Sequence, residues 1–210
     1  MKIGIVGSGN IGSTVGTLWV KAGHEVMFSS RRPETLGNLV SMLGNRASAG
    51  TSEEAAAFAD IGFFAVPFSA WPSLAEKLAP VLVGKIVIDA GNPYASRDGI
   101  IVEHVKTLGR GSGAFVAEMI PASDVVKAFN TLYYATLAQE AGREGERLAV
   151  PVAGNDALAV AKVAGLVRDA GFEPVTLNSI DRARDFDVGT PVYNKPMSAV
   201  ALRKSLGVPV

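Results

Sequence analysis

The residues with the clearest chemical meaning lie near the start of the chain, in a glycine-rich segment. Gly7, Gly9 and Gly12 have the spacing G-x-G-x-x-G between an apolar run and an amphipathic segment. In a strand–turn–helix unit the first glycine permits a tight turn, the second lets the backbone approach a pyrophosphate, and the third lets the helix pack closely on the sheet. Amides at the helix start then bind the negative charge. The spacing predicts a dinucleotide site, and the alternative is a plain glycine-rich turn.

The choice between NAD and NADP depends on the end of the second strand, where an NAD site usually has an acidic residue. This chain has Ser29, Ser30, Arg31 and Arg32 there. A carboxylate would repel a 2′-phosphate, whereas hydroxyl and guanidinium groups donate hydrogen bonds to it. Two such contacts of about 1.5 kcal/mol each would favour NADP on the order of a hundredfold. The segment therefore predicts NADP(H), and a solvated basic loop is the alternative.

Polar or rigid residues also follow several later apolar runs. Ligands of this fold gather at the carboxyl ends of strands. We expect Asn92, Asn130 and Thr131 to line the nicotinamide and to bind its carboxamide or the ribose, with Pro67 and Phe68 as a wall beside the ring. The alternatives are a turn residue before a proline for Asn92 and a helix cap for Asn130.

Four further side chains near these ends could take part in chemistry. Asp89 is expected to be a structural acid at a strand end, and Lys127 to pair with it or to meet an anionic substrate. Tyr133 and Tyr134 are interpreted as packing residues. No catalytic acid or base is assigned.

The elements that must position these residues alternate along the chain. Short apolar runs are followed by segments with helical spacing, which predicts a parallel sheet covered by helices on both faces. Thr51 and Glu54 form a capping-box pattern, and Pro33 suits the first turn of a helix. Strands are expected at 2–7, 25–29, 46–49, 61–66, 85–89, 125–129, 148–153 and 173–177, and helices at 11–22, 51–58, 69–78, 131–141 and 156–170.

The predicted fold is therefore α/β, a Rossmann-type doubly wound, mostly parallel sheet with a short C-terminal appendage. No linker or repeat interrupts it. We expect one NADP-binding domain over residues 1–210, with a body at 1–180 and a capping or dimer segment at 181–210, so a homodimer is expected.

Composition excludes several classes of function. The 210 residues are 48% hydrophobic and 19% charged, and 20 basic residues balance 20 acidic ones, so no nucleic-acid partner is expected. No apolar run is long enough for a membrane span, and no leader is apparent, so a cytoplasmic protein without a membrane partner is expected. The chain has no cysteine and only two histidines, far apart, so no metal site is expected.

Several of these segments together resemble the NADPH-dependent deazaflavin (coenzyme F420) reductase family. The resemblance lies in the Gly7 loop, Ser30–Arg31–Arg32, Val66–Pro67 and residues 126–131, with a related branch in the reductase domain of the STEAP metalloreductases. It implies that Gly7, Ser8, Gly9, Asn10 and Ile11 hold the pyrophosphate, that Ser30, Arg31 and Arg32 bind the 2′-phosphate, and that Val66, Pro67 and Asn130 flank the nicotinamide. We also expect Ala65, which precedes this last set, to bind the cofactor.

The resemblance implies an NADPH-dependent oxidoreductase that passes hydride to a small-molecule acceptor, F420 or a flavin. In archaeal members a histidine stands at the position of Asn130, so the acceptor stays open. The alternatives are a reductase of a small imine or carbonyl, similar to the N-terminal domain of pyrroline-carboxylate reductase, and a module that senses NADP without turning it over.

Overall fold

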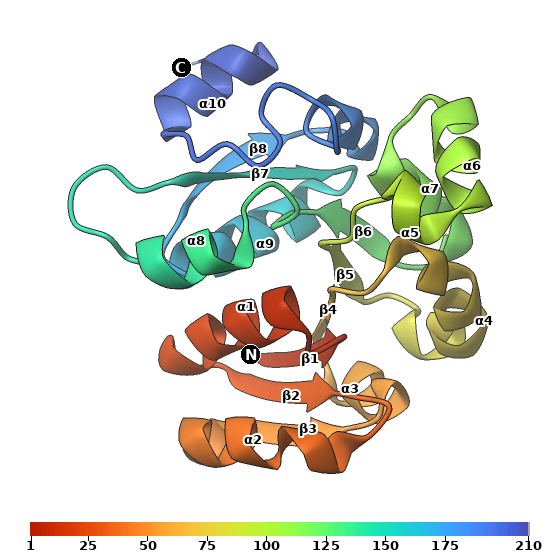
Figure 1. Cartoon of the computed structure of the whole chain (residues 1–210), viewed down its shortest axis with the longest axis vertical. Helices are drawn as coiled ribbons and strands as arrows, with labels where there is room; N and C mark the ends of the chain where they lie inside the picture. The colour runs from red at the N-terminus through yellow and green to blue at the C-terminus, as the bar shows by residue number, and fades with distance from the viewer. Residues whose placement is uncertain (210) are drawn as a thin grey trace.

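A single eight-stranded sheet forms the centre of the molecule, with the strand order β3-β2-β1-β4-β5-β6-β7-β8 (Figure 1). The computed structural model describes residues 1–209. All neighbouring strands are parallel except β6 and β7. The predicted Rossmann-type, mostly parallel sheet is confirmed. The strands are β1 (Lys2–Val6), β2 (Glu25–Ser29), β3 (Ala47–Gly50), β4 (Ile61–Phe64), β5 (Ile86–Asp89), β6 (Asp124–Lys127), β7 (Ala149–Gly154) and β8 (Glu173–Leu177).

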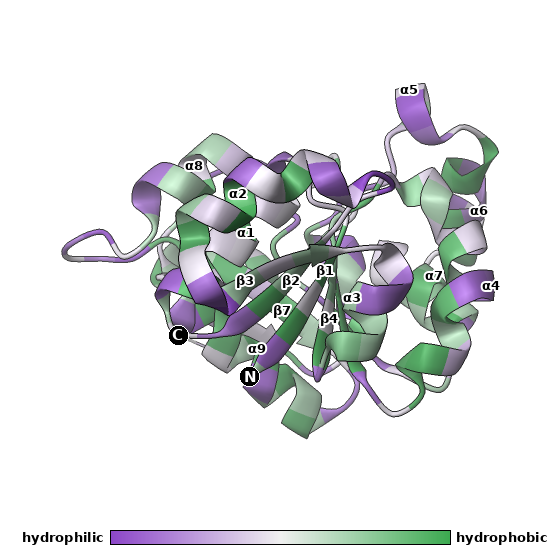
Figure 2. Ribbon diagram, turned by 90° about the horizontal axis from the view of Figure 1, so that it is seen from below, coloured by the Kyte–Doolittle hydropathy of each residue, from purple (hydrophilic) through white to green (hydrophobic). Residues whose placement is uncertain are grey.

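Helices cover both faces of this sheet. Helices α1 (Asn10–Lys21), α8 (Tyr134–Glu140) and α9 (Ala157–Asp169) share one apolar core with the sheet, and α4 (Trp71–Leu82), α6 (Ile100–Leu108) and α7 (Ser112–Met119) share another. Figure 2 shows α1 and α8 on one side of the strands and α4, α6 and α7 on the other. The remaining helices are α2 (Gly37–Leu43), α3 (Ser52–Phe58), α5 (Ala95–Asp98) and α10 (Ala199–Leu206), with 3₁₀ turns η1 (Pro33–Leu36), η2 (Gly44–Arg46), η3 (Phe68–Ala70) and η4 (Ile180–Asp185).

Several local predictions are confirmed at the level of single hydrogen bonds. Thr51 and Glu54 form both bonds of a capping box at the start of α3, and Pro33 occupies the first position of η1. Asp156 caps α9 by accepting from the amide of Ala159 at 2.7 Å. Strands β2 and β8 have the predicted bounds.

Around the end of β6 the sequence prediction is wrong. The strand ends at Lys127 rather than at 129, and Phe129 has a φ of 63°. The helix expected from 131 begins only at Tyr134, and its N-cap is Tyr133. Asn130 is therefore not a helix cap, because the chain first makes a tight turn that directs residues 130–133 along the edge of the sheet.

Helices α5, α6, α7 and α10 were not predicted. The first three follow one another between residues 95 and 119, separated by Gly99 and Gly111, both of which have positive φ. Helices α6 and α7 are short, and each supplies only part of a buried face. The glycines before them interrupt the apolar periodicity by which a helix is predicted. Helix α7 packs against α4 and β6, and α6 buries Ile101, Val102 and Val105 in the same apolar cluster. This packing stabilises helices that have too few turns to be stable alone.

The C-terminal segment packs on the far end of the sheet. Side chains of α10, Leu202 and Leu206, are buried with Val175 and Leu177 of β8, on the face of β8 that alternates away from α9. The division into a body at 1–180 and a capping or dimer segment at 181–210 stays a prediction. Within residues 1–209 no helix combines the length and apolar character that a membrane crossing requires.

Candidate cofactor and acceptor site

A cavity of about 680 Å³ opens at the carboxyl ends of β1, β2 and β4. It is lined by the loop after β1, the end of β2 and the loop after β4, which lie far apart in the sequence. The predicted residues that line it are Gly7, Ser8, Gly9, Ser29, Ser30, Arg31, Ala65, Val66 and Pro67. The fold therefore brings the glycine loop, the end of β2 and residues 65–67, all predicted to bind the cofactor, to one cavity.

The three glycines of the loop have different surroundings. Gly7 has a φ of 94°, and a Cβ there would lie 2.6 Å from the carbonyl oxygen of Ala65. A Cβ on Gly12 would lie 2.0 Å from the carbonyl oxygen of Gly7, whereas one on Gly9 would meet nothing within 4 Å. The absence of a side chain at Gly7 and Gly12 thus allows backbone segments to approach closely, whereas Gly9 borders open space. Asn10, Ile11 and Gly12 form the first turn of α1 and lie outside the cavity lining.

The start of α1 is suited to an anion. Gly9 is the N-cap and offers no side chain, the first turn contains no acidic residue, and the first helical hydrogen bond runs from the amide of Ser13 to Gly9. The preceding amides of a helix have no partner within it and carry its positive dipole end. The Ser8 hydroxyl is buried and has no hydrogen-bond partner among residues 1–209. A pyrophosphate would satisfy both requirements, so these residues fit a dinucleotide.

The end of β2 supplies the basic part of the cavity. Arg31 is exposed and lines it, while Arg32 is exposed and lies outside it. Ser29 is buried, and its hydroxyl accepts from the amide of Gly7 at 3.4 Å, which ties β2 to the glycine loop. The hydroxyl of Ser30 accepts from the amide of Arg32 at 3.1 Å. Among residues 1–209 no carboxylate lines the cavity.

Polar residues that the sequence prediction missed complete the lining. They are the hydroxyl-bearing residues Thr35, Ser52, Ser69 and Ser73. Ser69 lies in η3 and Ser73 lies four residues later, in the first turn of α4. That spacing directly after Pro67 is the signal by which they could have been found.

Asn92 and Asn130 meet at the ends of β5 and β6. The Asn92 amide nitrogen donates to the backbone oxygen of Asn130 at 2.9 Å, and the Asn130 amide nitrogen donates to Asn92 Oδ1 and to the carbonyl of Phe186, each at 3.2 Å. Asn130 Oδ1 is buried and has no partner among residues 1–209. A buried acceptor without a donor is costly. An N–H donor such as a carboxamide would satisfy this oxygen, although neither Asn92 nor Asn130 is among the residues that line the cavity.

Two other residues expected at the nicotinamide, Thr131 and Phe68, are buried. Thr131 is buried, and its backbone oxygen accepts from the amide of Asn194 at 2.9 Å. Phe68 is fully buried, with its ring centre 5.7 Å from that of Phe115. Phe68 does not line the cavity, because η3 turns its phenyl ring into the core. The expected wall beside the ring therefore consists of Pro67 alone.

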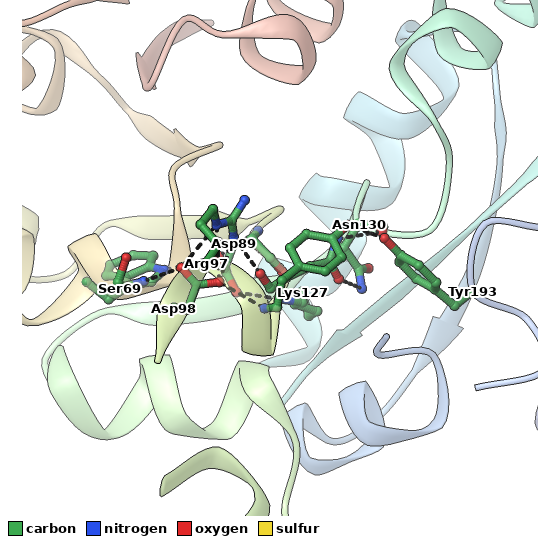
Figure 3. Close-up of polar contacts among 11 residues, drawn as sticks. Ser69, Asp89, Arg97, Asp98, Lys127, Asn130 and Tyr193 are labelled. Atoms are coloured by element: carbon green, nitrogen blue, oxygen red, sulfur yellow. Dashed lines mark hydrogen bonds and ion pairs between the residues drawn. The ribbon is translucent and has the colours of Figure 1, made fainter. Parts of the chain in front are cut away.

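Below the two asparagines lies a buried ion pair. Lys127 Nζ is 2.6 Å from Asp89 Oδ2, both side chains are inaccessible to solvent, and Lys127 also donates to the carbonyl of Gly91 (Figure 3). The other oxygen of Asp89 accepts from the Gly91 amide at 2.9 Å and from the Trp71 indole at 3.3 Å. Asp89 is thus the predicted structural acid, and Lys127 pairs with it. Together they fix the backbone that leads into Asn92.

A second buried carboxylate, missed by the sequence prediction, joins the loops after β4 and β5. Asp98 accepts from the amides of Ser69 at 3.0 Å and Tyr94 at 2.8 Å and from the guanidinium of Arg97 (Figure 3). Arg97 also donates to the carbonyl of Asn92 at 2.8 Å. Burial alone would raise the pKa of Asp98, but the hydrogen bonds from Arg97, Ser69 and Tyr94 outweigh it and lower the pKa to about 2.

Because of Asp98, the free energy of unfolding should depend on pH in the acid range. Its folded-state pKa lies below the ordinary value of 3.8, so its contribution is present above pH 4 and is lost as the pH falls toward 2. We expect about 2 kcal/mol of the free energy of unfolding to disappear over that range, and Asp98→Asn to remove this part of the slope. Urea unfolding at a series of pH values measures it, with the exposed Glu103→Gln as control. An unchanged slope in Asp98→Asn would contradict the assignment.

The C-terminal segment is attached to the same edge of the sheet through Asp187. This carboxylate accepts from the amide of Ser112 at 2.7 Å and from its hydroxyl at 2.6 Å. Burial raises the pKa of Asp187, against the opposing effects of Lys127 and of the bonds from Ser112. The preceding residue, Phe186, is thereby held where its carbonyl accepts from Asn130.

The histidines do not form part of this site. His24 lies 2.9 Å from Asp169 at the other edge of the sheet, and His104 is on α6. Over residues 1–209 no three His, Asp or Glu side chains form a group that could hold a metal ion.

Comparison with known proteins places this geometry among reductases. Residues 2–93 match the family described as NADP oxidoreductase, coenzyme F420-dependent. Metalloreductase STEAP3 of Rattus norvegicus is 34% identical over 99% of the chain, which spans only 40% of that relative's length. A crystal structure of a hypothetical protein from Sinorhizobium meliloti superposes with a TM-score of 0.80 at 28% identity, covering 94% of this chain and 95% of that one. A protein of Arthrobacter sp. FB24, proposed to be an F420-dependent NADP reductase, gives 0.78 at 26% identity, covering 94% and 99%.

Proposed function

Because residues 2–93 match the family of coenzyme F420-dependent NADP oxidoreductases, we propose that the chain binds NADPH in the cavity and transfers hydride to a flavin-type or deazaflavin acceptor. The observation that carries the cofactor assignment is the coincidence of three features in one cavity. They are an open helix start, a guanidinium at the end of β2 and a lining without carboxylates.

In this proposal the residues around the glycine loop bind the phosphates. The amides at the start of α1 and the hydroxyl of Ser8 face the pyrophosphate, and Arg31 with Ser30 faces the 2′-phosphate. Thr35, Ser69 and Ser73 supply further hydroxyl groups around the adenosine half. The cofactor supplies the hydride, and the protein supplies binding and orientation.

Asn92 and Asn130 orient the reactive half. The unpartnered Oδ1 of Asn130 accepts from the carboxamide of the nicotinamide, while its nitrogen is held by Asn92 and Phe186. Val66 and Pro67 line the cavity, and a Cβ on Gly91, the residue before Asn92, would lie 3.6 Å from the carbonyl oxygen of Val66. When one face of the nicotinamide ring is held toward the acceptor, the reacting atoms stay in a productive orientation. Such orientation is a major part of catalysis in hydride transfer.

The direct test of the cofactor assignment is Arg31→Asp. Removing the guanidinium and adding a negative charge should weaken NADPH binding at least tenfold, because hydrogen bonds to charged groups contribute about 1.5–3 kcal/mol, and should change NADH binding little. Titration calorimetry with both cofactors measures it. The matched control is Arg32→Asp, which makes the same charge change outside the cavity and should have a smaller effect. Equal losses for NADPH and NADH would contradict the proposal.

The acceptor is identified by turnover. NADPH oxidation is measured with F420, FMN, FAD, ferric chelates and small imines. We expect reduction of the flavin-type and deazaflavin compounds. Turnover with imines alone would support the imine reductase, and tight NADPH binding without turnover on any compound would support a sensing module.

A further inference from the structure

The tyrosines of this protein lie together beside the two asparagines. The sequence contains four tyrosines, Tyr94, Tyr133, Tyr134 and Tyr193, which we call the tyrosine rim. Tyr94 follows β5, Tyr133 and Tyr134 follow β6, and Tyr193 lies between η4 and α10. Three separate segments of the chain thus bring every tyrosine to one edge of the sheet.

A hydrogen bond joins two members of the rim, Tyr94 and Tyr193. The hydroxyls of Tyr94 and Tyr193 are bonded to each other, and Figure 3 shows Tyr193 reaching toward Asn130. The next residue, Asn194, has a φ of 53° and donates its amide to Thr131 at 2.9 Å. The ring of Tyr94 also lies 4.9 Å from the guanidinium carbon of Arg97. The C-terminal segment is therefore fixed across the ends of β5 and β6.

The rings of the rim are accessible, unlike most other aromatic rings in the chain. Trp19, Trp71 and seven of the nine phenylalanines are buried, whereas no tyrosine is. Tyr133 is 53% exposed, and its ring centre is 4.4 Å from that of Tyr134. Exposed tyrosines that are mutually oriented are typical of recognition surfaces, since each offers a rigid π face and a polar end. The interpretation of Tyr133 as a packing residue does not account for its exposure.

We propose that the tyrosine rim binds the acceptor, a planar conjugated ring system of the isoalloxazine type, with Tyr133 stacked on its face and Tyr193 bounding its edge. This inference rests on the proposed function for its place in the reaction and names the residues that select the acceptor. A small imine has no extended π face to stack, and a hydrated ferric ion has none. Burial and the bond to Tyr94 raise the pKa of Tyr193.

The experiment measures binding of riboflavin, an isoalloxazine without a phosphate, by quenching of its fluorescence, and binding of NADP⁺ separately by calorimetry. We expect Tyr133→Ala to raise the Kd for riboflavin about tenfold, the scale of one aromatic stack, with the Kd for NADP⁺ unchanged. Tyr133→Phe keeps the ring and should restore affinity to within about twofold. Phe58→Ala is the control, because Phe58 is a partly buried ring on α3 beside Lys2, at the opposite edge of the sheet.

The outcomes separate the two proposals. Riboflavin binding by Tyr133→Ala at the wild-type Kd would overturn the inference, as would a wild-type protein that binds NADP⁺ but not riboflavin. A wild-type protein that binds riboflavin in a Tyr133-dependent way but not NADP⁺ would support the rim and overturn the proposed function.

Discussion

Lys127→Met should lower the free energy of unfolding by about 3–5 kcal/mol, the largest stability effect that we expect for a single side chain. The substitution leaves the carboxylate of Asp89 in the core without its charge partner, and it removes the donor to the carbonyl of Gly91. A buried, uncompensated charge costs far more than the packing that methionine restores. Urea unfolding followed by circular dichroism measures it.

Two further variants show whether the ion pair is the cause. Lys106→Met removes an exposed pair with Glu103 and should change stability by less than about 0.5 kcal/mol. The double variant Asp89→Leu/Lys127→Met removes both charges and should recover part of the loss, since apolar replacements of a buried pair are often tolerated. A Lys127→Met protein as stable as wild type would mean that the pair does not determine the stability of the sheet edge.

Gly12→Ala should abolish NADPH binding, with a loss of more than a hundredfold, and should destabilise the fold by roughly 3 kcal/mol. Its Cβ would lie 2.0 Å from the carbonyl oxygen of Gly7, a backbone atom that can move only if α1 shifts away from the glycine loop. The helix start and the loop would then no longer face one ligand.

Gly9→Ala is the matched variant, because the same methyl group there meets no protein atom within 4 Å. The backbone at Gly9, with φ −75° and ψ −162°, also accepts alanine. We expect unchanged unfolding and a marked loss of NADPH affinity, since the methyl would occupy space assigned to the pyrophosphate. Wild-type NADPH affinity in Gly9→Ala would contradict the placement of the phosphates.

The parts of the fold that the sequence predicted share a local physical cause. The capping box at Thr51 and Glu54, the turn at Gly7 and the buried runs of β2 and β8 depend on residues within a few positions of one another. The ion pair of Asp89 with Lys127 could be foreseen as one of two possibilities, because both residues stand at the ends of adjacent parallel strands.

The parts that could not be predicted depend on contacts between distant segments. Asp98 also has local partners in Tyr94 and Arg97, but its bond to the amide of Ser69 crosses 29 positions of sequence, which no local pattern indicates. The carbonyl of Phe186 reaches Asn130 across 56 positions of sequence, and nothing near either residue indicates the other. Tyr133 and Tyr134 follow an apolar run, and an aromatic pair in that position has the same sequence pattern whether it faces the core or a ligand.

The position of the C-terminal segment has an evolutionary consequence under the proposed function. Residues that select the nucleotide lie before position 75, whereas polar contacts of the segment from Phe186 to Asn194 reach Asn130, Thr131 and Tyr94, on the acceptor side. Cofactor preference and substrate preference are thus encoded in stretches of the gene that can mutate or recombine independently. Chimaeras that exchange the residues from Asn130 onward between relatives should inherit the acceptor of the donor and the cofactor of the recipient.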